Sequence, residues 1–187
     1  MQNSIAKILF IIVSTFAFVG CATTPSEPAR FRTWDEEVKL NDGRVIVVSQ
    51  KYLCDPEATW LFSDRDTWLT IDIPEFRSKP IVWHEKLRPL VLNVHQGKLF
   101  VVRYPGTRVE LKYYGNPQPP YVGFRYDDGQ WRRIPFTDIP EAIYETNRIV
   151  ALTDVHGNFA NLTQKAKARE YRIAYERRID PAHRYVP

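Results

Sequence analysis

Short apolar runs separated by turn residues fill the chain from about residue 31 to residue 149. The run over 34–48 alternates apolar and polar residues and is interrupted by Asn41-Asp42-Gly43. The same arrangement recurs over 90–104 and over 121–136, again with a Gly at the turn. Asp-Gly and similar pairs tolerate the positive φ angles that tight turns need. The pattern therefore predicts three β-hairpins.

A further alternating, β-branched stretch lies over 68–73 and is closed by Pro74. Prolines recur from there to residue 140, which leaves no room for a long helix. We therefore predict a mainly β fold of seven to nine antiparallel strands, spanning 31–150, as a sandwich or a curled sheet. The expected core residues are Trp34, Val45, Val47, Leu69, Ile71, Val91, Leu99, Val101, Phe124 and Trp131.

The C-terminal part, 151–187, has a different texture. Residues 161–178 contain no Gly or Pro and place apolar residues near helical spacing, which predicts a loop followed by a C-terminal α-helix. Residues 161–187 hold seven Lys and Arg against three acidic residues, whereas 21–160 hold 18 against 19. The helix is either an ordinary solvated basic face or a contact for an anionic envelope component or lipid head groups.

The N-terminus carries targeting signals. Residues 1–20 have Lys7 followed by about a dozen apolar residues, too few to span a bilayer, which is typical of a signal peptide. The residues just before Cys21, ending in Gly20, resemble the lipobox of bacterial lipoproteins. That resemblance implies that Cys21 is lipidated and becomes the new N-terminus. Ordinary secretion and an uncleaved N-terminal anchor are the alternatives.

The residues after the lipobox extend this hypothesis. The segment 21–30 is small, polar and Pro-rich, as expected for a flexible tether. By resemblance to lipoproteins of Gram-negative bacteria, Ala22 implies transport to the outer membrane, with the fold facing the periplasm. If Cys21 carries lipid, Cys54 has no partner and is expected to be a buried apolar residue; if Cys21 stays free, a Cys21–Cys54 disulfide is possible.

A catalytic site is poorly supported. The stretch 152–158 looks like the Asp-x-His-Gly-Asn loop of calcineurin-like metallophosphoesterases, in which Asp154 and His156 would be metal ligands. That family also needs Asn-His and Gly-His pairs, and the chain has neither. We therefore expect no catalytic residues, no bound metal and no cofactor, and keep a phosphoesterase-like hydrolase using these two residues as the alternative.

The segment 113–121 is rich in Tyr and Pro. It is either a surface for stacking on sugars or docking a peptide, or a rigid connection whose tyrosines cover the core.

Several motifs resemble a group of uncharacterised proteobacterial lipoproteins and secreted proteins. They are the stretch 33–48 with Trp34 and Asp42-Gly43-Arg44, His95-Gln96-Gly97, and 116–126 with 131–135. The resemblance implies an envelope location and an intact β-rich module, and brings no activity.

Composition agrees with a single compact domain. The chain has 187 residues, 13% of them aromatic, and a net charge of +4, which excludes an intrinsically disordered chain. We therefore expect a lipid-anchored outer-membrane protein whose domain is a non-enzymatic binding or structural module. Its partners would be the membrane, through the lipid, and an envelope component or another envelope protein, not a nucleic acid.

Overall fold

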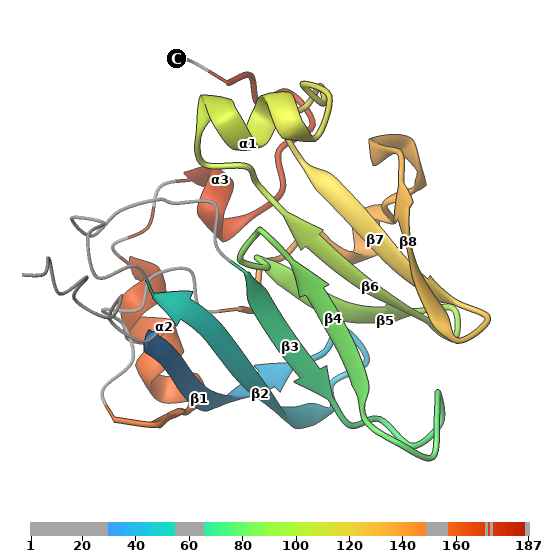
Figure 1. Ribbon diagram of the computed structural model, residues 1–187, viewed down its shortest axis with the longest axis vertical. Helices are drawn as coiled ribbons and strands as arrows, with labels where there is room; N and C mark the ends of the chain where they lie inside the picture. The colour runs from blue at the N-terminus through green and yellow to red at the C-terminus, as the bar shows by residue number, and fades with distance from the viewer. Residues whose placement is uncertain (1–29, 55–65, 149–156, 171, 173, 186–187) are drawn as a thin grey trace, which may run out of the picture.

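The fold consists of two β-sheets. In a computed structural model of the chain, the described residues are 30–54, 66–148 and 157–185, without 171 and 173. They form nine strands (Figure 1). One sheet, in the order β4-β3-β2-β1-β9, is built from β1 (Arg30–Lys39), β2 (Val45–Cys54), β3 (Thr67–Ile71), β4 (Ile81–Glu85) and β9 (Phe159–Ala160). The other, in the order β5-β6-β7-β8, is built from β5 (Val91–His95), β6 (Lys98–Arg103), β7 (Val122–Asp127) and β8 (Gln130–Ile134).

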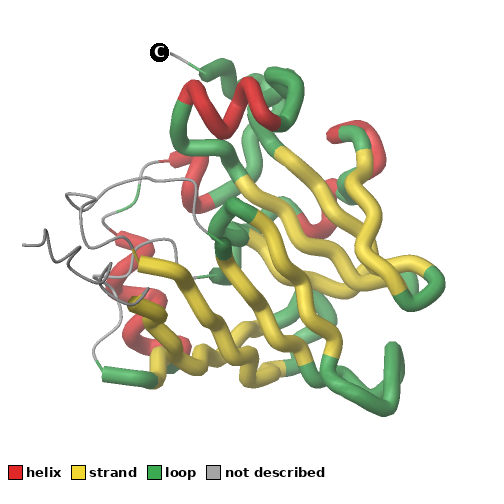
Figure 2. The backbone as a smooth tube through the Cα atoms, viewed as in Figure 1, coloured by secondary structure: helices red, strands yellow, loops and turns green. Residues whose placement is uncertain are grey.

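Strand pairing is antiparallel except between β9 and β1, which confirms the mainly β, antiparallel prediction. The helices are short and lie outside the sheets (Figure 2). They are α1 (Arg108–Tyr113), the 3₁₀ helices η1 (Phe136–Asp138) and η2 (Glu141–Ile143), α2 (Leu162–Glu170) and α3 (Ala174–Arg177). The prediction of a C-terminal helix is confirmed, but the span 161–178 contains two helices and not one.

Two of the predicted hairpins close with the expected turn chemistry. Gln96 and Gly97, between β5 and β6, both have positive φ angles of 49° and 69°. Asp128 and Gly129, between β7 and β8, have φ angles of 52° and 82°. Two consecutive positive φ angles match the right-handed twist of the flanking strands, so these turns fix the register of each hairpin locally.

The main hydrophobic core lies between the two sheets. Leu69 and Ile71 of β3 and Trp83 of β4 are fully buried, and they belong to one cluster with Leu99 of β6 and Phe124 of β7. The rings of Trp83 and Phe124 meet edge to face at 5.5 Å across this space. The sheets therefore pack face to face, as a sandwich does.

Two residues of the predicted core lie on the opposite face of β2. Val45 and Val47 are 49% and 52% exposed, so this prediction is wrong for both. Val48 points into the core instead. The run from Val45 to Val48 is apolar on both faces of the strand, so alternation cannot identify the buried one.

A second cluster covers the other face of the β5–β8 sheet. Val91 and Phe100 of that sheet pack with Ile143 of η2 and with Ile179 after α3. The backbone N–H of Asp180 donates to the Tyr121 hydroxyl at 3.0 Å. The C-terminal segment is therefore part of the folded domain.

The tyrosines of the segment 113–121 differ in burial. Tyr114 belongs to the main core and Tyr121 to the second cluster, whereas Tyr113 is 67% exposed. The interpretation of this segment as a connection covering the core therefore holds for Tyr114 and Tyr121.

Two side chains join the sheets to each other. The Asn147 amide accepts from the Leu92 N–H at 2.9 Å and donates to the carbonyls of Leu92, at 2.6 Å, and Lys39, at 2.9 Å. It thereby connects β5 to β1. On the opposite side, Trp131 Nε1 of β8 donates to the Val82 carbonyl of β4 at 3.0 Å.

Replacing Asn147 by Ala should destabilise the fold. Three backbone groups lose their partner, and we expect the free energy of unfolding to fall by about 2–4 kcal/mol. Urea unfolding followed by tryptophan fluorescence measures this change. Gln130→Ala, which truncates an exposed amide on β8, is the control and should shift stability by less than about 0.5 kcal/mol. Equal stability of the two variants would show that Asn147 does not join the sheets.

Candidate functional site

Helix α2 packs beside β1 mainly through polar contacts. Its N-terminus is capped by Asn161, whose Oδ1 accepts from the Gln164 N–H at 2.9 Å, while Gln164 Oε1 accepts from the Asn161 N–H. Glu37 of β1 accepts from the Leu162 N–H at 2.9 Å. Lys165 is the one buried residue of α2. The helix therefore lacks the apolar stripe by which surface helices usually pack.

Basic side chains from this region bind three consecutive carbonyl groups of residues 146–148. Lys165 Nζ donates to the Asn147 oxygen at 2.5 Å, Arg169 Nη1 to the Thr146 oxygen at 3.3 Å and Arg172 Nη1 to the Arg148 oxygen at 3.0 Å. Lys165 and Arg169, spaced i and i+4, lie on one side of α2, and Arg172 follows the end of that helix at Glu170. Part of the basic C-terminal charge therefore serves to hold the chain that bridges the sheets.

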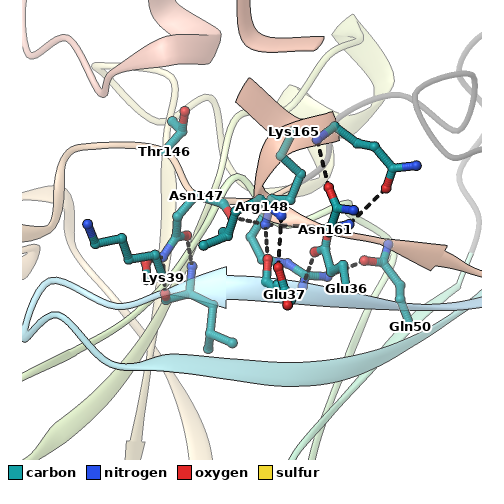
Figure 3. Close-up of polar contacts among 12 residues, drawn as sticks. Glu36, Glu37, Lys39, Gln50, Thr146, Asn147, Arg148, Asn161 and Lys165 are labelled. Carbon is teal, nitrogen blue, oxygen red and sulfur yellow. Dashed lines mark hydrogen bonds and ion pairs between the residues drawn. The ribbon is translucent and has the colours of Figure 1, made fainter. Parts of the chain in front are cut away.

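A buried ion pair lies beneath these contacts. Arg148 Nη1 pairs with Glu36 Oε1 of β1, and its Nη2 donates to Gln50 Oε1 of β2 (Figure 3). The side chains of Glu36 and Arg148 are both 0% exposed. Burial lowers the pKa of Arg148 from its ordinary value, and the Glu36 carboxylate opposes that effect. A buried cation of this kind is stable only with such a partner.

Lys165 connects the ion pair to the helix. Its Nζ lies 3.7 Å from Glu36 Oε2 and donates to the Glu37 carbonyl at 2.5 Å. Burial lowers the pKa of Lys165 to about 8; Glu36 raises it, and the nearby Arg148 and Arg172 lower it further. The charge of this side chain therefore changes slightly above neutral pH.

These side chains line a pocket of about 190 Å³. Among the residues that the structure describes, its lining contains five basic residues and no acidic one: Lys39, Arg148, Lys165, Arg169 and Arg172, together with Thr146, Asn147, Leu162 and Ala166. Figure 3 shows Lys39 and Lys165 on either side of the segment 146–148. A concave site with this lining can bind an anion by charge-assisted hydrogen bonds.

Two carboxylates near the pocket are each shared between two cations, and a third, that of Glu37, accepts from the Leu162 N–H. Glu36 pairs with Arg148 and Lys165. Glu145 pairs with Arg169 at 2.5 Å and with Arg178 at 2.7 Å. The backbone carbonyls that Lys165, Arg169 and Arg172 also contact satisfy hydrogen bonds but carry no net charge. The site therefore keeps a positive excess.

The sequence analysis proposed other residues as candidate sites. Cys21, Asp154 and His156 lie outside the described residues, so the predictions for them stay predictions; for Cys54, the side chain is likewise not described. Within the ranges the structure describes, no group of three or more His, Cys, Asp or Glu side chains is placed to hold a metal ion. No helix in those ranges is long and apolar enough to span a membrane.

The sequence identified only part of the pocket. The basic excess of 161–187 pointed to Lys165, Arg169 and Arg172, but not to Lys39 or Arg148. Nothing in the sequence around those two residues marks them, because they reach the pocket only when β1 and the segment 146–148 pack together. The i, i+4 spacing of Lys165 and Arg169 was the visible signal that these two side chains share one face of a helix.

Removing one partner of the buried ion pair should be costly. We expect Arg148→Met to lower the free energy of unfolding by about 3–5 kcal/mol, because the buried Glu36 carboxylate loses its guanidinium partner and retains the more distant ammonium group of Lys165, at 3.7 Å. The double variant Glu36→Leu, Arg148→Met should recover much of that loss. Chemical unfolding of the single and double variants measures both effects. As a control, Arg44→Met removes an exposed arginine paired with Asp42 and Glu75, and should cost less than about 1 kcal/mol.

If the double variant were as unstable as Arg148→Met alone, the cost would come from lost packing and not from an uncompensated charge.

Comparison with known proteins leaves the pocket as the basis for assigning a function. Searches against protein-family models, curated proteins and solved structures found no match to this chain. The role of the pocket therefore has to be argued from its charges, contacts and dimensions.

Proposed function

We propose that the protein is a lipid-anchored envelope protein, held at the outer membrane through Cys21, whose periplasmic domain binds an anionic envelope component without catalysing a reaction. The observation that carries the binding role is the described part of the pocket lining, with five basic residues and no acidic one. The lipobox resemblance at 17–21 supports the anchoring. The basic C-terminal segment supplies three of the five basic residues.

The arrangement of the charges favours binding over a purely structural role. A helix needs few cations to dock on neutral carbonyl groups. Among the described contacts between α2 and β1, none involves the side chain of Lys39. Its side chain is exposed and lines the same pocket as Arg169. Strand β1, the segment 146–148 and the helix α2 with the residues that follow it thus bring cations to one concavity, where an anion would be attracted from solution.

Anion binding should depend on the pocket and not on overall charge. We expect sulfate and succinate, two dianions of different shape, to shift amide signals of residues 146–148 and 162–172 in ¹H–¹⁵N spectra of the full chain in neutral detergent. Lys39→Gln and Arg169→Gln should each weaken binding about tenfold or more, since each removes a charge-assisted contact. The matched control is Lys79→Gln, in the β3–β4 connection, which should bind as the wild type does. Absence of binding by both anions would refute the binding role.

The affinity for sulfate should fall as pH rises from 7 to 9. Sulfate keeps its charge in this range, whereas Lys165, with its pKa of about 8, loses its proton. The groups facing Lys165 are Glu36 and the Glu37 carbonyl of β1, Arg148 and Arg172, so the lost charge lies beside the pocket. Sulfate titrations at several pH values measure the effect. Lys165→Arg keeps its charge and should show little pH dependence; the same decrease in that variant would assign it to another group.

The anchoring is tested separately from the pocket. Cys21→Ser should move the protein from the membrane fraction to the soluble fraction, because the acyl chains that would anchor it are attached through Cys21. The N-terminal peptide of the variant should also lack the mass of the acyl chains. Cell fractionation and mass spectrometry of the wild type and the variant measure both. The lipoprotein assignment would be contradicted if the variant stayed in the membrane fraction and the wild-type peptide carried no acyl mass. The pocket assignment would be unaffected by that result.

A further inference from the structure

We infer that the ligand of the pocket is an organic phosphate ester, with its phosphate at the basic side chains and a short organic group against Leu162 and Ala166. This inference rests on the proposed anion-binding function and specifies its ligand class. Three observations support it: the charge excess, the volume of the pocket and its one apolar wall.

The charge excess fits a dianion better than a monoanion. Glu36 is shared by Arg148 and Lys165, Glu145 by Arg169 and Arg178, and Glu37 accepts from the Leu162 N–H, so the five cations of the described lining outnumber the three carboxylates beside them. A ligand with a single carboxylate would neutralise only one of the positive charges that the protein's own carboxylates do not balance. A phosphate monoester carries about −1.5 to −2 at neutral pH and offers three acceptor oxygens. Guanidinium groups such as that of Arg169 match these oxygens in a bidentate manner.

The volume of the concavity leaves room for more than an inorganic ion, while a large organic group would extend out of it into solvent. A pocket of about 190 Å³ holds the equivalent of about six water molecules. The four oxygens of a free phosphate would take up at most about four of these. Pockets that enclose drug-sized ligands are usually about 300–1,000 Å³. Beside a phosphate group, the concavity therefore has room for a few atoms of an ester group.

The remaining space borders an apolar wall. Leu162 and Ala166 are the two apolar residues of the lining, and their i, i+4 spacing places them on the same face of α2. Ala166 is exposed and Leu162 is half-buried. An ester group lying there would remove this apolar surface from water, a gain that free phosphate cannot provide.

Glu145 competes with the ligand for Arg169. Its Oε2 lies 2.5 Å from Arg169 Nη2, and its carboxylate is exposed and outside the pocket lining. Removing this negative charge leaves Arg169 with its carbonyl contacts and frees part of its charge for the ligand. The inference therefore predicts a variant with increased affinity, which a damaged fold would not produce.

Calorimetric titration of the full chain in neutral detergent tests the ligand class. The probes are n-butyl phosphate, inorganic phosphate, butyrate and succinate. We expect n-butyl phosphate to bind about tenfold or more tightly than each of the other three. Arg169→Gln and Lys39→Gln should weaken its binding by about tenfold or more, since each removes a charge-assisted contact. Glu145→Gln should strengthen it severalfold, and Lys79→Gln should leave it unchanged.

The outcomes separate this inference from the proposed function. Succinate or butyrate binding as tightly as n-butyl phosphate, with the loss in Arg169→Gln retained, would overturn the phosphate ester and preserve an anion site. Inorganic phosphate binding as tightly would overturn the role of Leu162 and Ala166. Failure of all four probes would overturn the proposed function itself.

A second titration distinguishes the two sources of a phosphate ester. Short-chain phosphatidic acid in mixed micelles presents the group on a lipid, and glycerol 3-phosphate presents it in solution. Tighter binding of the lipid, lost in Lys39→Gln, would identify a membrane head group as the ligand. Tighter binding of glycerol 3-phosphate, lost in the same variant, would identify a soluble metabolite. Binding of neither would overturn the phosphate ester.

Discussion

The amide of Asn147 is the contact on which the arrangement of the domain depends. It is hydrogen-bonded to β1 and to β5, the strands at which the two sheets approach each other, and the backbone carbonyl of Asn147 accepts from Lys165 of α2. Three parts of the chain that are distant in sequence therefore meet at one residue. Because the neighbouring Arg148 is at the same time buried against Glu36, the position of the whole segment 146–148 is set by polar contacts.

Polar contacts of this kind select one arrangement more strictly than apolar packing does. Apolar surfaces can slide past one another at little cost, whereas a buried guanidinium requires its carboxylate at a defined place. The contacts between α2 and the sheets follow this logic, since the buried residue of the helix is Lys165. The same logic explains why cations collect at this place: they fix the helix, and the concavity between them is the site that we propose for an anion.

Local features of the fold could be predicted from the sequence, and long-range ones could not. The turns at 96–97 and 128–129 are determined by neighbouring residues, so the hairpins were predictable. The buried face of β2 could not be predicted, because both sides of this strand are apolar at Val45, Ile46, Val47 and Val48. For the pocket, the basic residues near 165–172 were visible as a charge excess, whereas Lys39 and Arg148 join them only through packing of β1 and the segment 146–148.

The way the sheets are joined also protects the domain from association with copies of itself. β5 is an outermost strand, and the Leu92 N–H and C=O that would pair with another chain are taken by the Asn147 amide, which imitates a neighbouring strand. On β4, the Val82 carbonyl is occupied by Trp131. β9, at the end of the same sheet, is only two residues long. On the membrane surface that we propose for this protein, closing these edges would suppress strand addition where neighbouring copies would meet most often.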